Sequence, residues 1–334
     1  MKAPIALAES HCQNGATEKH ENAIREDFMS QPKLIASGLQ FPEGPIAMPD
    51  GSVILVEIKR GTLTRVHPDG KTEVIANTGG GPNGAAIGPD GACYICNDGG
   101  FEWHEVGGLT IPGDKPANYS GGRIERVDLK TGKVDVLYTH CNGNPLIGPN
   151  DIVFDKHGGF WFTDHGKGDG RIQYRGGLYY AKIDGSLIKE VAFPVLSANG
   201  VGLSPDEKTV YVADTYSARL FAFDIVAPGE VAPAAGPGGP GRYVGTAPGH
   251  CFFDSLAVDA EGNICVATLL HGGITTFSPD GSKITHTAFD DILPTNICFG
   301  GKDLKTAFIT LSASGRLVSV EWPTAGLPLN FLNK

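Results

Sequence analysis

The chain repeats one short pattern six times, and this repeat restricts the folds that it can adopt. Each copy has an oxygen-bearing residue, a small or polar residue, a short apolar segment, a Pro/Asp/Gly turn and then an alternating apolar strand. The first residues of the copies are Glu43, Asn83, Asn150, Asn199, Asp254 and Asn296. A unit repeated roughly every 40–50 residues is typical of a radial array. The repeat therefore predicts an all-β protein, a six-bladed β-propeller with four-stranded antiparallel blades.

The repeats continue from about Glu43 to the end of the chain without a linker, so we expect residues 33–334 to form one propeller. Residues 1–32 carry no repeat, and we interpret them as a short N-terminal arm or a short helix on the propeller. A ring of sheets must close, because an open edge leaves backbone groups unpaired. The last repeat lacks an outer strand, and we expect residues 33–39 to supply it.

The copies are unevenly spaced, and the extra length falls in two segments. Residues 99–122 contain Phe101, Trp103, His104 and Tyr119, which favours a lid or a pocket wall. Residues 228–249 begin with a run rich in Pro, Gly and Ala. Such a run has little to pack, so we interpret this second segment as a surface loop.

The composition excludes several classes of protein. A net charge of −10 argues against a nucleic-acid partner, since phosphate binding needs a basic surface. No apolar run approaches the ~18 residues of a membrane span. Residues 1–20 have no apolar signal-peptide core, so the expected location is cytoplasmic and no membrane partner is expected.

The seven cysteines do not suggest a disulfide framework, because their number is odd and they are spread across the repeats. Cys93 and Cys96 form a C-x-x-C motif inside a strand pattern. Residues three apart on a strand point to opposite faces, which is wrong for a shared metal or a redox pair. We expect buried structural thiols.

The first residues of the repeats would all face one central channel. Glu43, Asn150, Asn199 and Asp254 offer two carboxylates and two amide oxygens, a set that suits Ca²⁺ first, with Mg²⁺, Mn²⁺, Zn²⁺ or Fe²⁺ left open. A single Asn or Asp before a strand is usually a turn residue. An oxygen donor in all six copies, one of them a Glu, favours one divalent metal ion on the axis.

Four motifs carry a resemblance to a known family: Phe41–Pro45, Gly148–Asp151, Ala198–Asp206, and Asp254 followed by Val258–Gly262. They resemble the regucalcin/gluconolactonase/luciferin-regenerating enzyme family over roughly residues 33–320. The resemblance implies a six-bladed propeller with an axial metal and hydrolysis of lactones. It assigns Glu43, Asn199 and Asp254 as metal ligands. Asn150 matches the asparagine that contacts the metal, its water or the substrate.

The catalytic residues expected from these observations are Asp254 and Asn150. A bound metal would polarise a lactone carbonyl and lower the pKa of water. Asp254 would then serve as ligand and as proton acceptor. The expected substrate contacts are Asn83, Trp103, His104, His165 and His271. The two last histidines follow strand ends at matching places, and for them a pocket role and a structural role are about equally favoured.

The leading functional hypothesis is a metal-dependent lactonase that opens a sugar lactone or a similar small cyclic ester. One alternative is a phosphotriesterase-like hydrolase on the same site, and another is a non-catalytic calcium-binding propeller. No G-x-S-x-G motif supports a serine esterase. The expected partner is a small-molecule lactone, and the oligomeric state is left open.

Overall fold

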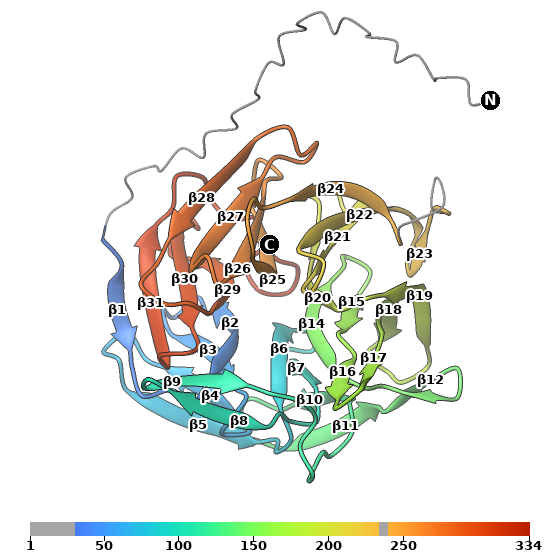
Figure 1. Cartoon of the computed structure of the whole chain (residues 1–334), viewed down its shortest axis with the longest axis horizontal. Coiled ribbons are helices and arrows are strands. Elements are labelled where there is room, and N and C mark those ends of the chain that lie inside the picture. Colours follow the sequence, from blue (N-terminus) through green and yellow to red (C-terminus); the bar gives the residue numbers. More distant parts are fainter. Residues whose placement is uncertain (1–30, 234–239) are drawn as a thin grey trace, which may run out of the picture.

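The computed structural model describes residues 31–233 and 240–334, and it shows a ring of sheets around a central axis (Figure 1). Six antiparallel sheets form the blades, and the inner strand of each blade contacts the inner strands of its two neighbours. The predicted six-bladed propeller is therefore confirmed. The described residues contain no helix. The helix considered for the N-terminal arm falls almost wholly on residues outside the described part.

Each blade has four strands in the order of an antiparallel meander. The inner strands are β2 (Pro42–Ala47), β6 (Pro82–Ile87), β14 (Pro149–Phe154), β20 (Ala198–Leu203), β25 (Phe252–Val258) and β29 (Pro294–Gly300). The second strands are β3 (Val53–Glu57), β7 (Cys93–Asn97), β15 (Gly159–Asp164), β21 (Thr209–Asp214), β26 (Ile264–Leu269) and β30 (Thr306–Leu311). The third strands are β4 (Thr62–Val66), β10 (Arg123–Val127), β18 (Gly176–Lys182), β22 (Arg219–Ala227), β27 (Gly273–Phe277) and β31 (Arg316–Glu321). The outer strands are β5 (Thr72–Asn77), β11 (Val134–Tyr138), β19 (Ile188–Val195), β24 (Arg242–Thr246), β28 (Ile284–Ala288) and β1 (Lys33–Ala36).

The first strand closes the ring. Strand β1 pairs antiparallel with β31 and so becomes the outer strand of the last blade, as the sequence predicts. Ala36 and Leu39 bury their side chains against the first blade beside Leu317 of β31. The closure removes an exposed sheet edge and joins the two ends of the propeller in one core.

The hydrophobic core is divided into six clusters, one between each pair of neighbouring blades. Alternation along a strand distributes its side chains between two clusters. In β3, for example, Ile54 and Val56 pack toward the second blade, whereas Leu55 packs toward the last blade. Cys93 and Cys96 likewise lie in different clusters. Both are free and buried, so the prediction of structural thiols on opposite faces is confirmed.

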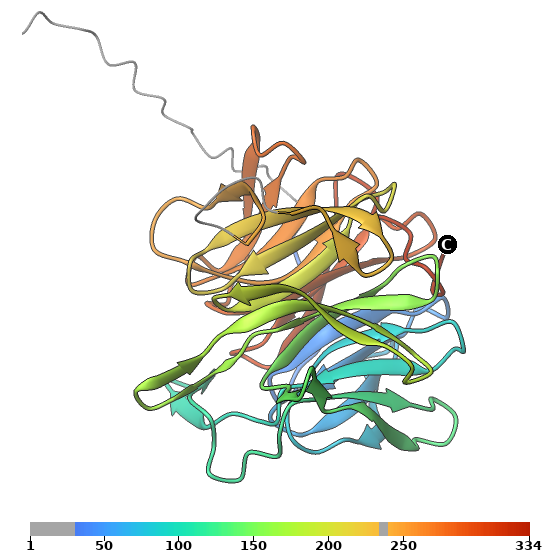
Figure 2. The ribbon, with the colours of Figure 1, turned by 90° about the vertical axis from the view of Figure 1, so that its right-hand side faces the viewer.

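Short hairpins and one extra strand decorate the blades. The hairpins are β8 (Trp103–Val106) with β9 (Leu109–Pro112), β12 (His140–Cys141) with β13 (Asn144–Pro145), and β16 (Lys167–Asp169) with β17 (Ile172–Tyr174). Strand β23 (Glu230–Val231) extends the fourth blade by pairing with the end of β22. Seen from the side, the hairpin β16–β17 and the C-terminus lie on opposite faces of the disc (Figure 2).

The interpretation of residues 228–249 as a surface loop is wrong for their last part. Arg242–Thr246 forms β24, which pairs with β22 as the outer strand of the fourth blade. Val244 in its middle is buried in the core between the fourth and fifth blades. The Pro/Gly/Ala run before this strand made it hard to predict, because one buried valine gives only a weak alternating pattern.

Within residues 31–233 and 240–334, no helix has the length and hydropathy of a membrane span.

Candidate metal and substrate site

The six oxygen-bearing residues lie at the beginnings of the six inner strands. Each of these strands has a shift in register at or directly beside this residue, for example between Glu43 and Ile46 in β2 and between Phe253 and Leu256 in β25. In β6, β14 and β20 the shift spans the donor, and in β29 it lies directly before Asn296. A β-bulge bends the strand and redirects a side chain that would otherwise face a neighbouring blade. The repeat in the sequence therefore encodes a repeated bulge.

Glycines after three of the donors allow the inner strands to approach closely. A Cβ on Gly44 would lie 2.5 Å from the carbonyl oxygen of Asn83, and one on Gly84 would lie 2.4 Å from that of Asn150. A Cβ on Gly200 would lie 2.8 Å from the carbonyl oxygen of Asp254. Such distances exclude any side chain larger than hydrogen. The donor–Gly pairs are thus required for the tight ring at the axis.

Glu43 is buried and held by two hydrogen bonds. Its Oε2 accepts a bond from Asn296 Nδ2 at 2.7 Å and another from the backbone NH of Gly44. Burial raises the pKa of Glu43 well above its ordinary value, and the negative charge of Asp254 raises it further. The second oxygen of this carboxylate, Oε1, has no hydrogen-bond partner from the protein.

Asp254 lies beside Asn199. Asn199 directs its Nδ2 to Thr215 Oγ1 at 3.0 Å, so its carbonyl oxygen faces the other way, where Ser255 Oγ donates to it at 3.5 Å. The backbone NH of Ser255 donates to Asp254 Oδ1 at 3.1 Å. Burial raises the pKa of Asp254 to about 8, and the negative charge of Asp151 adds to the rise.

The third blade contributes two adjacent polar side chains, Asn150 and Asp151. Asp151 accepts backbone bonds from Ile152 at 2.9 Å and from Val201 of the next blade at 3.1 Å. Burial raises the pKa of Asp151 to about 7. The carboxylate therefore ties two inner strands together, while Asn150 Oδ1 remains without a partner.

Three buried side-chain polar atoms lack a hydrogen-bond partner in the part of the chain that the structure describes. They are Glu43 Oε1, Asn83 Oδ1 and Asn150 Oδ1. All three are oxygens, and all three belong to the repeated position. Unpaired buried oxygens are costly in a protein alone, and so are the buried carboxylates of Glu43, Asp151 and Asp254, whose pKa values burial raises. The donor set thus fits a hard divalent cation.

The same described residues contain no group of three or more His, Cys, Asp or Glu side chains that could hold a metal. A cation here would depend on amide oxygens as well as on the two carboxylates of Glu43 and Asp254. Carbonyl and carboxylate oxygens together are typical of Ca²⁺ sites, whereas zinc sites are built mainly from Cys and His.

Asn83 is connected to a buried ion pair. Its Nδ2 donates to Asp98 Oδ2 at 3.3 Å, and Lys167 Nζ lies 3.3 Å from Asp98 Oδ1. Lys167 begins β16, and it also donates to the carbonyl oxygen of Gly100 at 2.8 Å. Burial lowers the pKa of Lys167, and the charge of Asp98 opposes this shift. Residues 99–122 are thereby joined to the third blade.

His165 follows β15 directly and lies among other rings near the same end of the channel. Its ring centroid lies 5.4 Å from that of Tyr216, which in turn lies 6.0 Å from that of Phe252. Phe252 stands two residues before Asp254 in the chain. Burial, with a smaller contribution from the charge of Lys167, lowers the pKa of His165 to about 4. The position suits the substrate contact that the sequence suggests for His165.

Trp103, His104 and His271 are placed differently. Trp103 packs its ring 5.1 Å from that of Phe41, directly before the strand that carries Glu43. His104, the next residue on β8, is exposed. His271 is exposed in the turn between β26 and β27, with its ring 6.1 Å from that of His286 on the outer strand β28. Within the described part of the chain, neither His104 nor His271 makes a hydrogen bond or ring contact with the axial donors.

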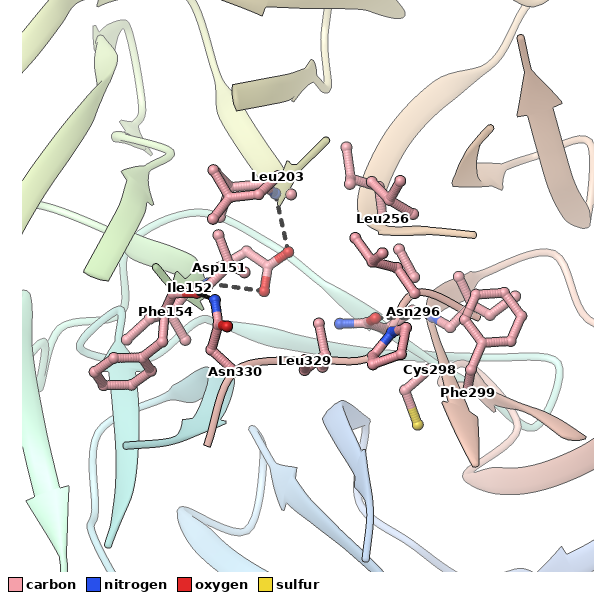
Figure 3. A pocket seen from close by; sticks show the side chains of 18 of the residues that line it. Asp151, Ile152, Phe154, Leu203, Leu256, Asn296, Cys298, Phe299, Leu329 and Asn330 are labelled. Carbon is pink, nitrogen blue, oxygen red and sulfur yellow. Dashed lines mark hydrogen bonds between the residues drawn. The ribbon is translucent and has the colours of Figure 1, made fainter. Parts of the chain in front are cut away.

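The opposite end of the channel is covered by the C-terminal segment. A cavity of about 100 Å³ lies below the donors, and Figure 3 shows Asp151 and Asn296 on its walls with Leu329 and Asn330 across it. Asn330 Nδ2 donates to the carbonyl oxygen of Phe154 at 3.1 Å and to Glu207 Oε1 at 3.0 Å. These bonds attach the C-terminal residues around Asn330 to the third and fourth blades.

Sequence reasoning missed Asp98, Asp151, Thr215 and Lys167 as parts of the site. Asp151 and Thr215 each follow a recognisable position, since one succeeds Asn150 and the other succeeds the end of β21. Lys167 gave no such signal, because it lies 69 residues from Asp98 in a segment outside the repeat.

Comparisons with known proteins agree with this architecture. The family described as "SMP-30/Gluconolactonase/LRE-like region" matches residues 41–313. A lactonase drp35 from Staphylococcus saprophyticus is 32% identical over 254 residues, which cover 75% of this chain and 70% of that protein.

Two solved structures share the fold at low identity. A gluconolactonase from Xanthomonas campestris has a TM-score of 0.68 at 20% identity, covering 87% of this chain and 89% of that one. A regucalcin from Agrobacterium tumefaciens, described as a calcium-binding protein, has a TM-score of 0.66 at 18% identity, covering 89% and 95%. The resemblance inferred from the motifs is confirmed, and the chain belongs to the SMP-30/gluconolactonase/LRE-like family.

Proposed function

We propose that the chain is a metal-dependent lactonase with one divalent cation, Ca²⁺ first, at the end of the channel where the inner strands begin. Glu43, Asn199 and Asp254 would hold the ion, with Asn150 beside it. The observation that carries the proposal is the set of unpaired oxygens on Glu43, Asn83 and Asn150, all at one repeated position. The lactonase name of the 32% identical relative supports the reaction class.

When bound, the cation would polarise the lactone carbonyl and favour ionisation of water. The chain itself supplies the base and the orientation. Asp254 accepts the proton of the attacking water, and the bound cation would keep this buried carboxyl group ionised, as a general base requires. Asn199 holds Asp254, and Thr215 holds the amide of Asn199.

The remaining residues bind and orient the substrate. Asn83 and Asn150 offer oxygens that accept hydrogen bonds from ring hydroxyls or from water. The contacting rings of His165, Tyr216 and Phe252 would provide a surface on which a small ring can pack. Sugar lactones and similar small cyclic esters are the substrate class that we propose.

A hydrolysis screen tests this function directly. The metal-stripped chain is assayed with an aldonolactone, an aromatic lactone and a phosphotriester, before and after addition of Ca²⁺, Mg²⁺, Mn²⁺ or Zn²⁺. We expect lactone opening that chelation abolishes and that a divalent ion restores. Cleavage of the phosphotriester alone, or metal binding without hydrolysis of any ester, would contradict the lactonase proposal.

A further inference from the structure

The side-chain amide of Asn83 has a fixed orientation. A neutral amide can present either its oxygen or its NH₂ group to a neighbour, and only the neighbour decides which. The neighbour here is a carboxylate, which accepts hydrogen bonds and does not donate them when ionised. Asn83 therefore donates Nδ2 to Asp98 Oδ2 at 3.3 Å, and its Oδ1 faces away without a protein partner.

Asp98 is itself held in place from several sides. Its Oδ1 accepts the backbone NH of Gly100 at 2.7 Å and lies 3.3 Å from Lys167 Nζ. The absence of a side chain at Gly81 makes room for it, since a Cβ there would lie 2.3 Å from Asp98 Oδ1. With Oδ1 engaged by two donors, Oδ2 is left to receive Asn83.

Lys167 occupies an unusual position for a lysine. Its side chain is 1% exposed, and its Nζ lies 3.4 Å from the ring centroid of Phe101. Burying an ammonium group and a carboxylate costs several kcal/mol per ion, and an apolar pair of similar volume is often equally stable. Stability alone therefore gives a weak reason for this ion pair. The hydrogen bond that Asp98 accepts from Asn83 gives a stronger reason for the ion pair.

We propose that Asp98 and Lys167 are positioning residues that lock the Asn83 amide with its oxygen toward the axial site. Through this lock, residues 99–122 and the hairpin β16–β17 act on the cation site without touching it. Asn83 thereby presents its oxygen to the cation site as well as to the substrate, beside the oxygens of Glu43 and Asn150. The inference rests on the proposed axial cation.

The test reverses the polarity of the pair. In Asp98→Asn, the amide oxygen would stay with Gly100 and Lys167, so its NH₂ group would face the NH₂ group of Asn83. Asn83 would then turn its own NH₂ group toward the axis. We expect Ca²⁺ affinity, measured by chelator competition, to fall about tenfold or more, the scale of lost support around a metal site.

The double variant Asn83→Asp/Asp98→Asn exchanges the two groups and keeps the net charge. Asp at position 83 would accept the bond from the new amide and again present an oxygen to the axis, so most of the lost affinity should return. Lys167→Met should weaken Ca²⁺ binding less than Asp98→Asn, because Gly100 still holds Asp98.

Asp169→Asn is the matched control. Lys115 and Asp169 form a more exposed ion pair between the same two segments, so its loss should leave Ca²⁺ affinity unchanged. Thermal unfolding in chelator reports any general loss of stability. If the wild-type chain binds Ca²⁺ and Asp98→Asn binds it equally well, or if the exchange restores nothing, the positioning role is wrong. If the wild-type chain binds no divalent ion, the proposed function itself fails.

Discussion

The two ends of the axial channel are built from the same six strands but carry opposite chemistry. At the beginnings of the strands, bulges bring oxygen donors together, and three of their oxygens remain unpaired. Toward the other end, Leu203, Leu256 and Phe299 line a small cavity that Leu329 helps to cover (Figure 3). At this end Asn330 is hydrogen-bonded within the protein, since its Nδ2 donates to the carbonyl oxygen of Phe154 and to Glu207 Oε1.

This difference separates stability from function within one repeat. The covered end satisfies its polar atoms internally, as expected for groups that maintain a fold. At the donor end, three buried oxygens have no hydrogen-bond partner. Burial also raises the pKa of both Glu43 and Asp254. The buried oxygens without a hydrogen-bond partner in the described residues all lie at the donor end, which supports the proposal of a ligand there.

The largest expected effect is at Asp254. Asp254→Asn keeps the size and one oxygen but removes the charge and the proton acceptor. We expect turnover of a lactone at saturating Ca²⁺ to fall about 10²-fold or more, the scale of general-base loss. Steady-state kinetics measures it. Wild-type turnover in this variant would move the base elsewhere, with His165 next to be tested.

A smaller effect is expected at Asn296, which supports Glu43 rather than facing the site with a free oxygen. Asn296→Ala removes the 2.7 Å bond to Glu43 Oε2 and the acceptor of the Ile297 NH. We expect Ca²⁺ affinity to fall about tenfold, with turnover at saturating Ca²⁺ reduced far less than in Asp254→Asn. A loss of turnover as large as that of Asp254→Asn would place Asn296 among the catalytic groups.

At the covered end, a substitution should affect stability and leave catalysis intact. Asn330→Ala removes the bonds to Phe154 and Glu207, each worth about 1 kcal/mol. We expect the free energy of unfolding in urea to fall by about 1–2 kcal/mol and turnover to stay within about twofold of wild type. A loss of Ca²⁺ binding in this variant would break the distinction between the two ends.

The smallest expected effect is that of His165 on the stability of the folded chain at acidic pH. Its folded pKa of about 4 lies below the ordinary value of 6.5, so the unfolded chain protonates first as pH falls. His165 therefore destabilises the folded chain progressively from about pH 6.5 to about pH 4. His165→Gln should show a smaller fall in Tm between pH 7 and pH 4, by a few degrees, since about 1 kcal/mol shifts Tm by roughly 2–4 °C in large domains. Equal falls in both proteins would exclude this role.

The sequence predicts the fold and the axial donors for the same reason. Each blade repeats one bulged inner strand, so Glu43 and its five counterparts are visible as a repeated position. The closing strand β1 is also predictable, because the last repeat is one strand short and a ring must close. Local patterns and their repetition are sufficient for these features.

Features that depend on contacts between distant segments are not predictable in this way. Lys167 and Asp98 meet only because a hairpin of the third blade folds against residues 99–122. His271 looked equivalent to His165, but β26 turns back at Leu270, whose φ is +69°, and His271 lies beside an outer strand. In the third blade, the chain instead continues into β16 and β17 after His165.

Calorimetric titration of the metal-stripped chain with Ca²⁺ tests most directly whether Glu43, Asn199 and Asp254 hold one divalent cation at the beginnings of the inner strands. We expect one ion per chain, binding that Glu43→Gln abolishes, and unchanged binding in Asn330→Ala. Ca²⁺ at 100 times its Kd should stabilise the wild-type fold by about 2.7 kcal/mol. A chain that binds no ion after dialysis against Ca²⁺, Mn²⁺ and Zn²⁺, or a Glu43→Gln variant that binds Ca²⁺ as the wild type does, would exclude an axial cation held by Glu43.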